Sequence, residues 1–392
     1  MHGKLLVDGA HLIARGALHA GIDLYVGYPI TPASGIYTEM MRAGVGIAAP
    51  DEITAFQYLI GAALNGHRVM TATSAPGFLL MAEGIGEALA MEVPVTLVLV
   101  QRLGPATGSA TMNAQGDLLM AANIVSGGFT LPLICPSSME ELPEITVLAV
   151  NVAEILRAPV VLLTEKDMVV GKRTIDPARL QFPEPIQRRQ YTGDPAAFET
   201  YGNLDDHEVP GFRPLGDSEV RIRATASTHD ERGMLTAFNE RVRAATERLL
   251  ICKHLELFPT AREDLQPGAE ELVLTYGFTS YAAQEAVNRL RAEGRRVSLV
   301  VVRTLFPLLL EPLRAALAGV RRLCVVEENL TGQYATALLG GGLLQGLPPV
   351  ELRRVNGMGS PITPDGIVAA LSAPPALPGS RAGATPAAEV TR

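Results

Sequence analysis

The sequence predicts an α/β protein with mainly parallel sheets. Short apolar runs of strand length alternate with segments of helical periodicity, and this alternation occurs twice, before residue 170 and after residue 268. Because such strands lack a polar face, helices must cover both sides of the sheets that they form. Strands and helices that alternate along a chain are typical of the α/β class.

Residues 1–170 supply the elements of the first predicted domain. Amphipathic patterns predict helices over residues 9–20, 53–64, 77–91 and 139–156. Apolar runs rich in β-formers predict strands over residues 24–26, 68–73, 95–100, 131–135 and 160–163. We expect a further helix after Ser34, with the Ser34 side chain as its N-cap.

The rest of the chain divides into a connector, a second domain and a tail. The connector, residues 171–267, is rich in Pro, Arg, Asp and Gly in its first part, and it carries a predicted strand at 220–224 and a helix at 231–250. The second domain, residues 268–372, has predicted strands over 271–276, 297–302, 323–326 and 350–353, and predicted helices over 280–292, 310–318 and 333–344. Residues 373–392 are rich in Ala and Pro and are predicted to be disordered.

Composition narrows the class of protein. Of the 392 residues, 47% are hydrophobic and only 19% are charged, which indicates surface that is buried against other subunits. No apolar run reaches the roughly 18 residues of a membrane span. Residues 1–4 show no signal-peptide pattern, so we expect a cytoplasmic protein. The net charge of −8 argues against nucleic acid as a partner.

The cysteines do not predict a metal site. Cys135, Cys252 and Cys324 are far apart and no CxxC occurs, so the chain lacks the usual four-thiolate pattern of an iron–sulfur cluster. We expect buried free thiols.

The run GYPITPAS, residues 27–34, follows an apolar segment and places Thr31 between two prolines. Proline fixes its own φ and restricts the residue before it, so the backbone around Thr31 is stiff. A strand end, a rigid turn and a helix start would hold this hydroxyl in a preset place. Read alone, the same run is equally typical of a Pro-rich turn between a strand and a helix.

Three later segments carry further candidate residues. Glu52 lies in the first turn of a predicted helix, where an acid serves the helix dipole or a specific site, whereas Glu83 is interpreted as structural or interfacial. The segment TATSAPGFLLMAEG, residues 71–84, is a small-residue turn that binds an anion or allows tight packing. Arg102 follows an apolar strand, where it would bind a carboxylate or form a surface ion pair.

In this order and spacing, the segments 27–34, 51–55, 71–84 and 100–108 resemble the alpha subunit of the 2-oxoacid:ferredoxin oxidoreductases, which are thiamine-diphosphate enzymes. The resemblance extends from about residue 3 to residue 371. It implies that residues 1–170 form the pyrimidine-type domain of the thiamine-diphosphate-binding fold. It also implies that residues 268–372 form a domain like the transketolase C-terminal domain.

The resemblance assigns roles to individual residues. Glu52 matches the carboxylate that this family places against N1′ of the aminopyrimidine, where it favours the imino tautomer. Thr31 and Arg102 would orient the head group of the 2-oxoacid. The resemblance also implies that Tyr28, Pro29 and Ser74 contact the cofactor beside Glu52.

The implied reaction is the coenzyme A-dependent oxidative decarboxylation of a 2-oxoacid to an acyl-CoA and CO₂, with electrons passing to ferredoxin. We expect 2-oxoglutarate as the substrate, with a branched-chain 2-oxoacid or pyruvate as alternatives. The loop at 111–117 keeps Gln115-Gly116-Asp117 but lacks the charged pair that many members carry before it, and Leu103 replaces a common glycine. These departures leave the substrate open and also leave a non-catalytic scaffolding paralogue as an alternative.

The chain lacks the Gly-Asp-Gly motif that this family's diphosphate-binding subunit uses. The resemblance therefore implies a thiamine diphosphate shared with a beta subunit, which would supply Mg²⁺ and an iron–sulfur cluster. Ferredoxin and coenzyme A are further expected partners, and gamma and delta subunits are additional candidates. The segment around His229 is interpreted as a turn and helix cap, and Glu327-Glu328-Asn329 with Gly332-Gln333 as markers of the fold.

Overall fold

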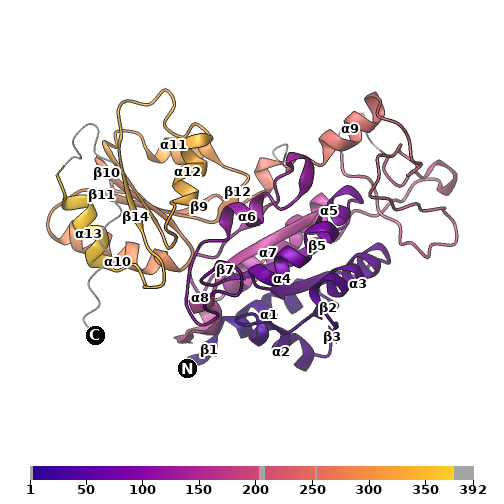
Figure 1. Cartoon of the computed structure of the whole chain (residues 1–392), viewed down its shortest axis with the longest axis horizontal. Coiled ribbons are helices and arrows are strands. Elements are labelled where there is room, and N and C mark those ends of the chain that lie inside the picture. Colours follow the sequence, from indigo (N-terminus) through magenta and orange to yellow (C-terminus); the bar gives the residue numbers. More distant parts are fainter. Residues whose placement is uncertain (1–2, 203–207, 252–253, 375–392) are drawn as a thin grey trace.

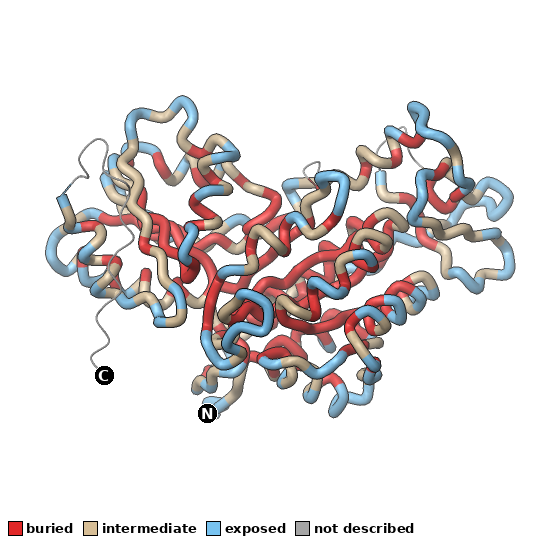
Figure 2. The backbone as a smooth tube through the Cα atoms, in the orientation of Figure 1, coloured by how far each residue is buried: buried red, intermediate tan, exposed pale blue. Residues whose placement is uncertain are grey.

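The computed structural model describes residues 3–202, 208–251 and 254–374, and it confirms the α/β class. The chain forms two larger sheets, each flanked by helices (Figure 1). Buried residues concentrate on the strands of both sheets and on the helix faces that contact them (Figure 2). The predicted disordered tail falls largely outside the described residues, as does Cys252. Cys135 and Cys324 are buried free thiols, as expected.

The first sheet has seven strands in the order β12-β6-β7-β5-β4-β2-β3, and all of its pairings except that of β12 are parallel. Every residue of β5 and β7 is buried, so both faces of the sheet are covered. Its strands are β2 (Leu24–Gly27), β3 (Gly46–Ala48), β4 (Val69–Thr73), β5 (Val95–Gln101), β6 (Leu133–Ile134), β7 (Pro159–Glu165) and β12 (Thr304–Phe306).

The helices of the first half pack in two groups. One group joins α1, α2 and α7, and another joins α3, α4 and α5. The helices are α1 (Gly9–His19), α2 (Ser34–Arg42), α3 (Glu52–Leu64), α4 (Ala75–Leu80), α5 (Ala82–Ala90), α6 (Leu118–Ala122), α7 (Leu142–Leu156) and α8 (Lys166–Val170). A small antiparallel pair, β1 (Leu5–Asp8) and β8 (Lys172–Ile175), closes this half.

Two local predictions are wrong. The helix predicted over residues 77–91 is two helices, because the helical pattern is interrupted at Met81, which caps both α4 and α5. Ser34 is not an N-cap: it is the first residue of α2, and the preceding Ala33 offers no side-chain hydrogen bond.

The second sheet has the order β14-β13-β10-β11-β9, and only β9 is antiparallel to its neighbour. The strands are β9 (Ala261–Asp264), β10 (Glu271–Tyr276), β11 (Val297–Val302), β13 (Arg322–Glu327) and β14 (Glu351–Asn356). The helices around it are α10 (Ser280–Ala292), α11 (Leu310–Ala316), α12 (Gln333–Gly340) and α13 (Pro364–Ser372).

The two sheets are not independent, because β12 comes from the second half of the chain but pairs with β6 of the first sheet. Side chains add further links across the same boundary. The hydroxyl of Tyr281 accepts from the Met139 amide at 3.0 Å, and the Arg303 guanidinium pairs with Glu141 at 2.8 Å. The second half of the chain therefore completes the first sheet.

The connector is mostly irregular. The strand predicted over 220–224 does not form, and the helix predicted over 231–250 is only α9 (Glu240–Arg248). Residues before α9 are held in a turn, in which the Asp230 carboxylate accepts from the amides of Arg232 and Met234, and Gly233 has φ +73°. Besides β8 and β9, the described part of the connector contains the 3₁₀ turns Pro177–Arg179, Pro195–Ala197 and Leu255–Leu257.

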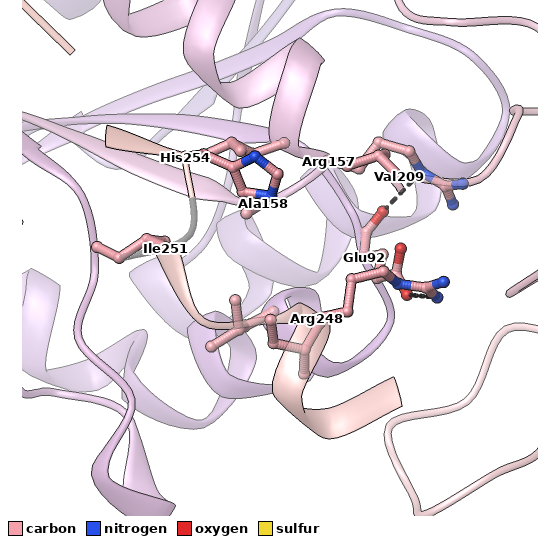
Figure 3. A pocket seen from close by; sticks show the side chains of 10 residues that line it. Glu92, Arg157, Ala158, Val209, Arg248, Ile251 and His254 are labelled. Atoms are coloured by element: carbon pink, nitrogen blue, oxygen red, sulfur yellow. Dashed lines mark hydrogen bonds and ion pairs between the residues drawn. The ribbon is translucent and has the colours of Figure 1, made fainter. Parts of the chain in front are cut away.

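Ion pairs and hydrogen bonds of buried arginine side chains attach the connector to the amino-terminal edge of the first sheet. Arg188 forms an ion pair with Glu154 at 2.8 Å, and both side chains are 4% exposed. Figure 3 shows Glu92, just before β5, between Arg157, which donates to the Glu92 carbonyl, and Arg248, which pairs with its carboxylate. The pocket in Figure 3 therefore lies at the opposite edge of the sheet from the motifs of the sequence analysis.

Candidate active site

The topology brings the sequence motifs to one edge of the first sheet. Tyr28, Ser74 and Arg102 each follow the last residue of a parallel strand, namely β2, β4 and β5. The segment that leads from β3 into α3 carries Glu52. The carboxyl ends of parallel strands meet at one edge, where α/β proteins bind their ligands.

Arg102 links the strand end of β5 to the Pro-rich turn. Its Nη1 donates a hydrogen bond to the main-chain oxygen of Thr31, while its Nε has no hydrogen-bond partner among the described residues. Arg102 is only 6% exposed and forms no ion pair within the described part of the chain. The geometry therefore differs from a surface ion pair and leaves a buried donor available at the edge of the sheet.

Glu52 is the first residue of α3 and is 6% exposed. The helix is capped by the preceding Asp51, whose carboxylate accepts from the Thr54 amide at 2.7 Å, an interaction that holds the pKa of Asp51 below its usual value. Within the described residues, no hydrogen bond or ion pair engages the Glu52 carboxylate. Asp51 therefore caps α3, whereas the Glu52 carboxylate has no hydrogen-bond or ion-pair partner among the described residues.

The space beside Glu52 depends on Gly77, near the start of α4. A Cβ atom at this position would lie 2.5 Å from Glu52 Oε1 and 2.2 Å from Thr73 Oγ1. Real Cβ atoms do not approach other atoms so closely, so only glycine allows the acid to reach the junction of β4 and α4.

The other predicted site residues divide by exposure. Ser74 is fully buried, and its hydroxyl has no partner in the described structure. Tyr28 is 42% exposed, and Pro29 and Thr31 are also exposed. Glu83 is exposed on α5.

Several polar residues at the same edge were not selected from the sequence. Gln101 and Glu165 end β5 and β7, and Asp117 precedes α6. Each carries one buried polar atom without a partner among the described residues, Gln101 Nε2, Glu165 Oε2 and Asp117 Oδ2. A polar residue that closes an otherwise apolar strand is the signal that would have identified Gln101 and Glu165.

Burial sets the protonation of this cluster. It raises the pKa of Asp117 to about 6, although the positive charge of Arg102 opposes the shift. It also raises the pKa of Glu165 to about 8, although a hydrogen bond from Gln115 opposes the shift. This cluster therefore combines the Arg102 cation with an Asp117 carboxyl that titrates near pH 6 and a Glu165 carboxyl that is mainly protonated at neutral pH.

Among residues 3–202, 208–251 and 254–374, no group of three or more His, Cys, Asp or Glu side chains could hold a metal ion. Over the same residues, no helix has both the length and the apolar character needed to cross a membrane.

Two family models match the chain. One, described as "Pyruvate flavodoxin/ferredoxin oxidoreductase, thiamine diP-bdg", matches residues 15–244, and one described as "Pyruvate:ferredoxin oxidoreductase core domain II" matches residues 269–341. The 2-oxoglutarate synthase subunit KorA of Methanothermobacter marburgensis is 35% identical over 343 residues, covering 84% of this chain and 89% of that protein. The ketoisovalerate oxidoreductase subunit VorB of Methanothermobacter thermautotrophicus is 34% identical over 364 residues, covering 90% and 93%.

Solved structures resemble the whole fold. The 2-oxoglutarate:ferredoxin oxidoreductase of Magnetococcus marinus, solved with 2-oxoglutarate, coenzyme A and succinyl-CoA, matches with a TM-score of 0.84 and 26% identity over 93% of this chain. This chain spans 64% of that protein's length. A split-gene transketolase in an inactive β4 tetramer has a TM-score of 0.51 and 13% identity over 93% of this chain and 95% of its own, which shows a transketolase-like fold alone. The extent of these matches, in particular to KorA and to the thiamine-binding family model, shows that the chain belongs to the 2-oxoacid:ferredoxin oxidoreductases as an alpha subunit.

Proposed function

We propose that the carboxyl edge of the first sheet is the pyrimidine half of a thiamine-diphosphate site, with 2-oxoglutarate as the 2-oxoacid substrate. The observation that carries this proposal is the buried Glu52 carboxylate, which has no partner among the described residues and faces a glycine. The oxygens of this carboxylate are therefore free to bind a ligand at the edge of the sheet.

The residues present fit an aminopyrimidine ring. The ring needs one carboxylate at N1′, and Glu52, at the start of α3, would provide it. Gly77 keeps the space beside the carboxylate free of a side chain, and the unpartnered Ser74 hydroxyl is a further polar group at the same edge. Tyr28 and Pro29 would flank the ring from the exposed turn after β2.

When bound, thiamine diphosphate supplies a nucleophilic carbon for the carbonyl of the substrate. Glu52 would hold a proton at N1′ of the aminopyrimidine. This would favour the imino tautomer of the ring, in which the nitrogen at the other end can accept a proton. Arg102 would bind the carboxylate of the 2-oxoacid through its free Nε and its remaining donors, because a guanidinium presents two parallel donors to a carboxylate. Thr31 holds Arg102 through its main-chain oxygen and leaves its own hydroxyl for the substrate.

The choice of substrate rests on relatives of two kinds. Subunits named for 2-oxoglutarate synthase and for ketoisovalerate oxidoreductase are 35% and 34% identical to this chain. The solved relative with the TM-score of 0.84 holds 2-oxoglutarate, which favours that substrate here. The uncharged residues 111–114 offer no cation to a second carboxylate, and this favours a branched-chain acid such as 2-oxoisovalerate as the second candidate.

The site requires another chain. Apolar side chains are exposed around it, with Tyr28 at 42%, Ile53 at 53% and Leu80 at 52%. We infer that a beta subunit covers this face and supplies the diphosphate and Mg²⁺ ligands and an iron–sulfur cluster. Electrons would pass to ferredoxin, and coenzyme A would accept the acyl group. The proposed domains are residues 1–170 for the pyrimidine site, 171–267 as the connector and 268–372 as the second domain.

The assembled enzyme with Glu52→Gln tests this function. Glutamine keeps the shape of the side chain but cannot hold the proton, so turnover should fall by about 10²–10⁴-fold while assembly is retained. Glu83→Gln, on the exposed face of α5, is the matched control and should leave turnover unchanged.

The same assay should compare 2-oxoglutarate, 2-oxoisovalerate and pyruvate by kcat/KM with ferredoxin as the acceptor. A higher kcat/KM for 2-oxoisovalerate would replace the proposed substrate. Near-normal turnover in Glu52→Gln would remove Glu52 from the site, and absence of turnover with all three acids in the unaltered enzyme would favour a scaffolding role.

A further inference from the structure

The loop that starts at Arg102 is fastened to the second half of the chain. Residues 102–117 run from the end of β5 to the start of α6. Residues 105–109 are exposed, and bonds such as Leu103 N to Met112 O at 3.0 Å are internal to the loop. The far end of the loop, in contrast, is buried against residues that are more than 150 positions away in the sequence.

Gln115 makes the central contacts. Its Nε2 donates to Glu165 Oε1 at 2.7 Å and to the Tyr276 main-chain oxygen at 3.1 Å. Its Oε1 accepts from the Glu328 amide at 2.8 Å, and its own amide donates to the Glu328 carbonyl at 2.8 Å. The side chain is 0% exposed, its Nε2 donates to two acceptors, and its Oε1 accepts one hydrogen bond.

Two further residues hold the loop on either side of Gln115. Asn113 Nδ2 donates to Glu328 Oε2 at 2.7 Å, and Asn113 Oδ1 accepts from the Asp167 amide at 3.0 Å. Gln333, the first residue of α12, donates to the Gly116 oxygen at 2.7 Å and accepts from the Leu119 amide at 3.0 Å. The contact places α12 beside α6 (Figure 1).

We propose that Gln115, Glu328 and Gln333 are positioning residues that hold the Arg102 loop in its binding geometry, so that the second half of the chain sets the affinity for the 2-oxoacid. The proposal rests on the proposed role of Arg102. The Glu-Glu-Asn and Gly-Gln segments, interpreted from the sequence as markers of the fold, then act on the substrate site through the loop.

The physical reason is that the exposed part of the loop, residues 105–109, depends on the buried end of the loop for its position. At one end of the loop, the Arg102 guanidinium donates to the Thr31 main-chain oxygen. At the other end, the Asp117 amide donates to Gln101 Oε1 at 3.1 Å. If the contacts to Gln333 and Glu328 are lost, the segment between these points gains conformational freedom, and the buried guanidinium must be reordered each time substrate binds. The cost should appear in the KM for the acid that Arg102 binds.

Gln333→Ala in the assembled enzyme is the test, because Gln333 is half-buried on the surface of α12 and its truncation leaves no empty core space. We expect the KM for the 2-oxoacid to rise about fivefold, the change that corresponds to one net hydrogen bond, with the KM for coenzyme A within about twofold. Gln284→Ala is the matched control: Gln284 lies on α10 and bonds Asp264 and Asn288, not the loop.

A double-mutant cycle with Arg102→Lys separates positioning from a general structural effect. If Gln333 acts through Arg102, the double variant should have nearly the same KM as Arg102→Lys alone. In the full chain, hydrogen exchange of the amides at 103–112 should also rise in Gln333→Ala and not in Gln284→Ala.

The results distinguish failure of the proposed role of Arg102 from failure of the positioning proposal. An unchanged KM in Arg102→Lys overturns the proposed role of Arg102. A raised KM in Arg102→Lys with an unchanged KM in Gln333→Ala, or fully additive effects in the double variant, overturns only the positioning proposal.

Discussion

Glu165 at the end of β7 should make the stability of this chain depend on pH. It is fully buried, and its Oε1 accepts from Gln115 Nε2 at 2.7 Å and from the Phe278 amide at 3.3 Å. Its Oε2 has no partner among the described residues. Burial, reinforced by the nearby Glu328 and Asp167, raises the pKa of Glu165 from 4.5 to about 8.

The raised pKa of Glu165 determines the direction in which stability changes with pH. A carboxyl whose pKa is raised in the folded state contributes stability that is fully present below the unfolded pKa, here 4.5, and is lost as pH rises to about 8. Each pKa unit corresponds to about 1.4 kcal/mol, so the window represents at most about 4–5 kcal/mol. Glutamine has the same shape and never ionises. Glu165→Gln should therefore flatten the pH dependence and raise the free energy of unfolding at pH 8 by about 1–3 kcal/mol.

Denaturant unfolding of the full chain at pH 5, 6, 7 and 8 measures this effect. Glu83→Gln, an exposed acid on α5, provides a control that should follow the unaltered chain at every pH. Parallel curves for Glu165→Gln and the unaltered chain would refute the argument, because they would mean that Glu165 ionises equally in both states. A variant less stable at pH 8 would show that the site needs the carboxylate.

Two further predictions concern the site itself. Asp117 has a pKa of about 6 beside Arg102, so its ionisation between pH 5 and 7 should raise the KM for the 2-oxoacid. Asp117→Asn should remove this step and lower the KM at pH 7, and a pH series of KM values in which the step persists would exclude the role. Gly77→Ala places a Cβ atom 2.5 Å from Glu52 Oε1. Turnover should fall by about 10²-fold or more with a loss of about 1–3 kcal/mol in unfolding free energy, and unchanged kinetics would show that Glu52 has room to move.

The sequence predicts the strands and helices well where hydrophobic periodicity is strong. The strands β4, β5, β7, β10 and β11 were predicted within two residues at each end, because they are continuous apolar runs between helices. The connector was predicted least well. Its residues are fixed by contacts such as Arg188 with Glu154, and a contact between distant residues has no local pattern. The strand predicted over residues 131–135 forms only as the two-residue β6, and the edge strand β12 is too short for a periodic signal.

The site residues were also predictable only where they belong to a local sequence pattern. Thr31, Glu52 and Arg102 could be selected because each stands at a strand end or a helix start within a recognisable run of sequence. Their convergence follows from the parallel topology. The absence of partners around Glu52 and the space that Gly77 leaves cannot be predicted in this way, since both depend on which side chains face the edge from other elements.

The second half of the chain supports both the first sheet and the loop that carries Arg102. The first sheet takes its edge strand β12 from residues 304–306, and the loop that carries Arg102 takes its anchor from Glu328 and Gln333. Both links join to the same half of the chain, so a change in the second half reaches the substrate site through the sheet edge and through the loop. Because Gln115 bonds Glu328 through both its main-chain amide and its Oε1, a shift of Glu328 must break these buried hydrogen bonds or move the loop with it. Through this coupling, the proposed positioning residues would set the affinity of the proposed substrate site without touching the substrate.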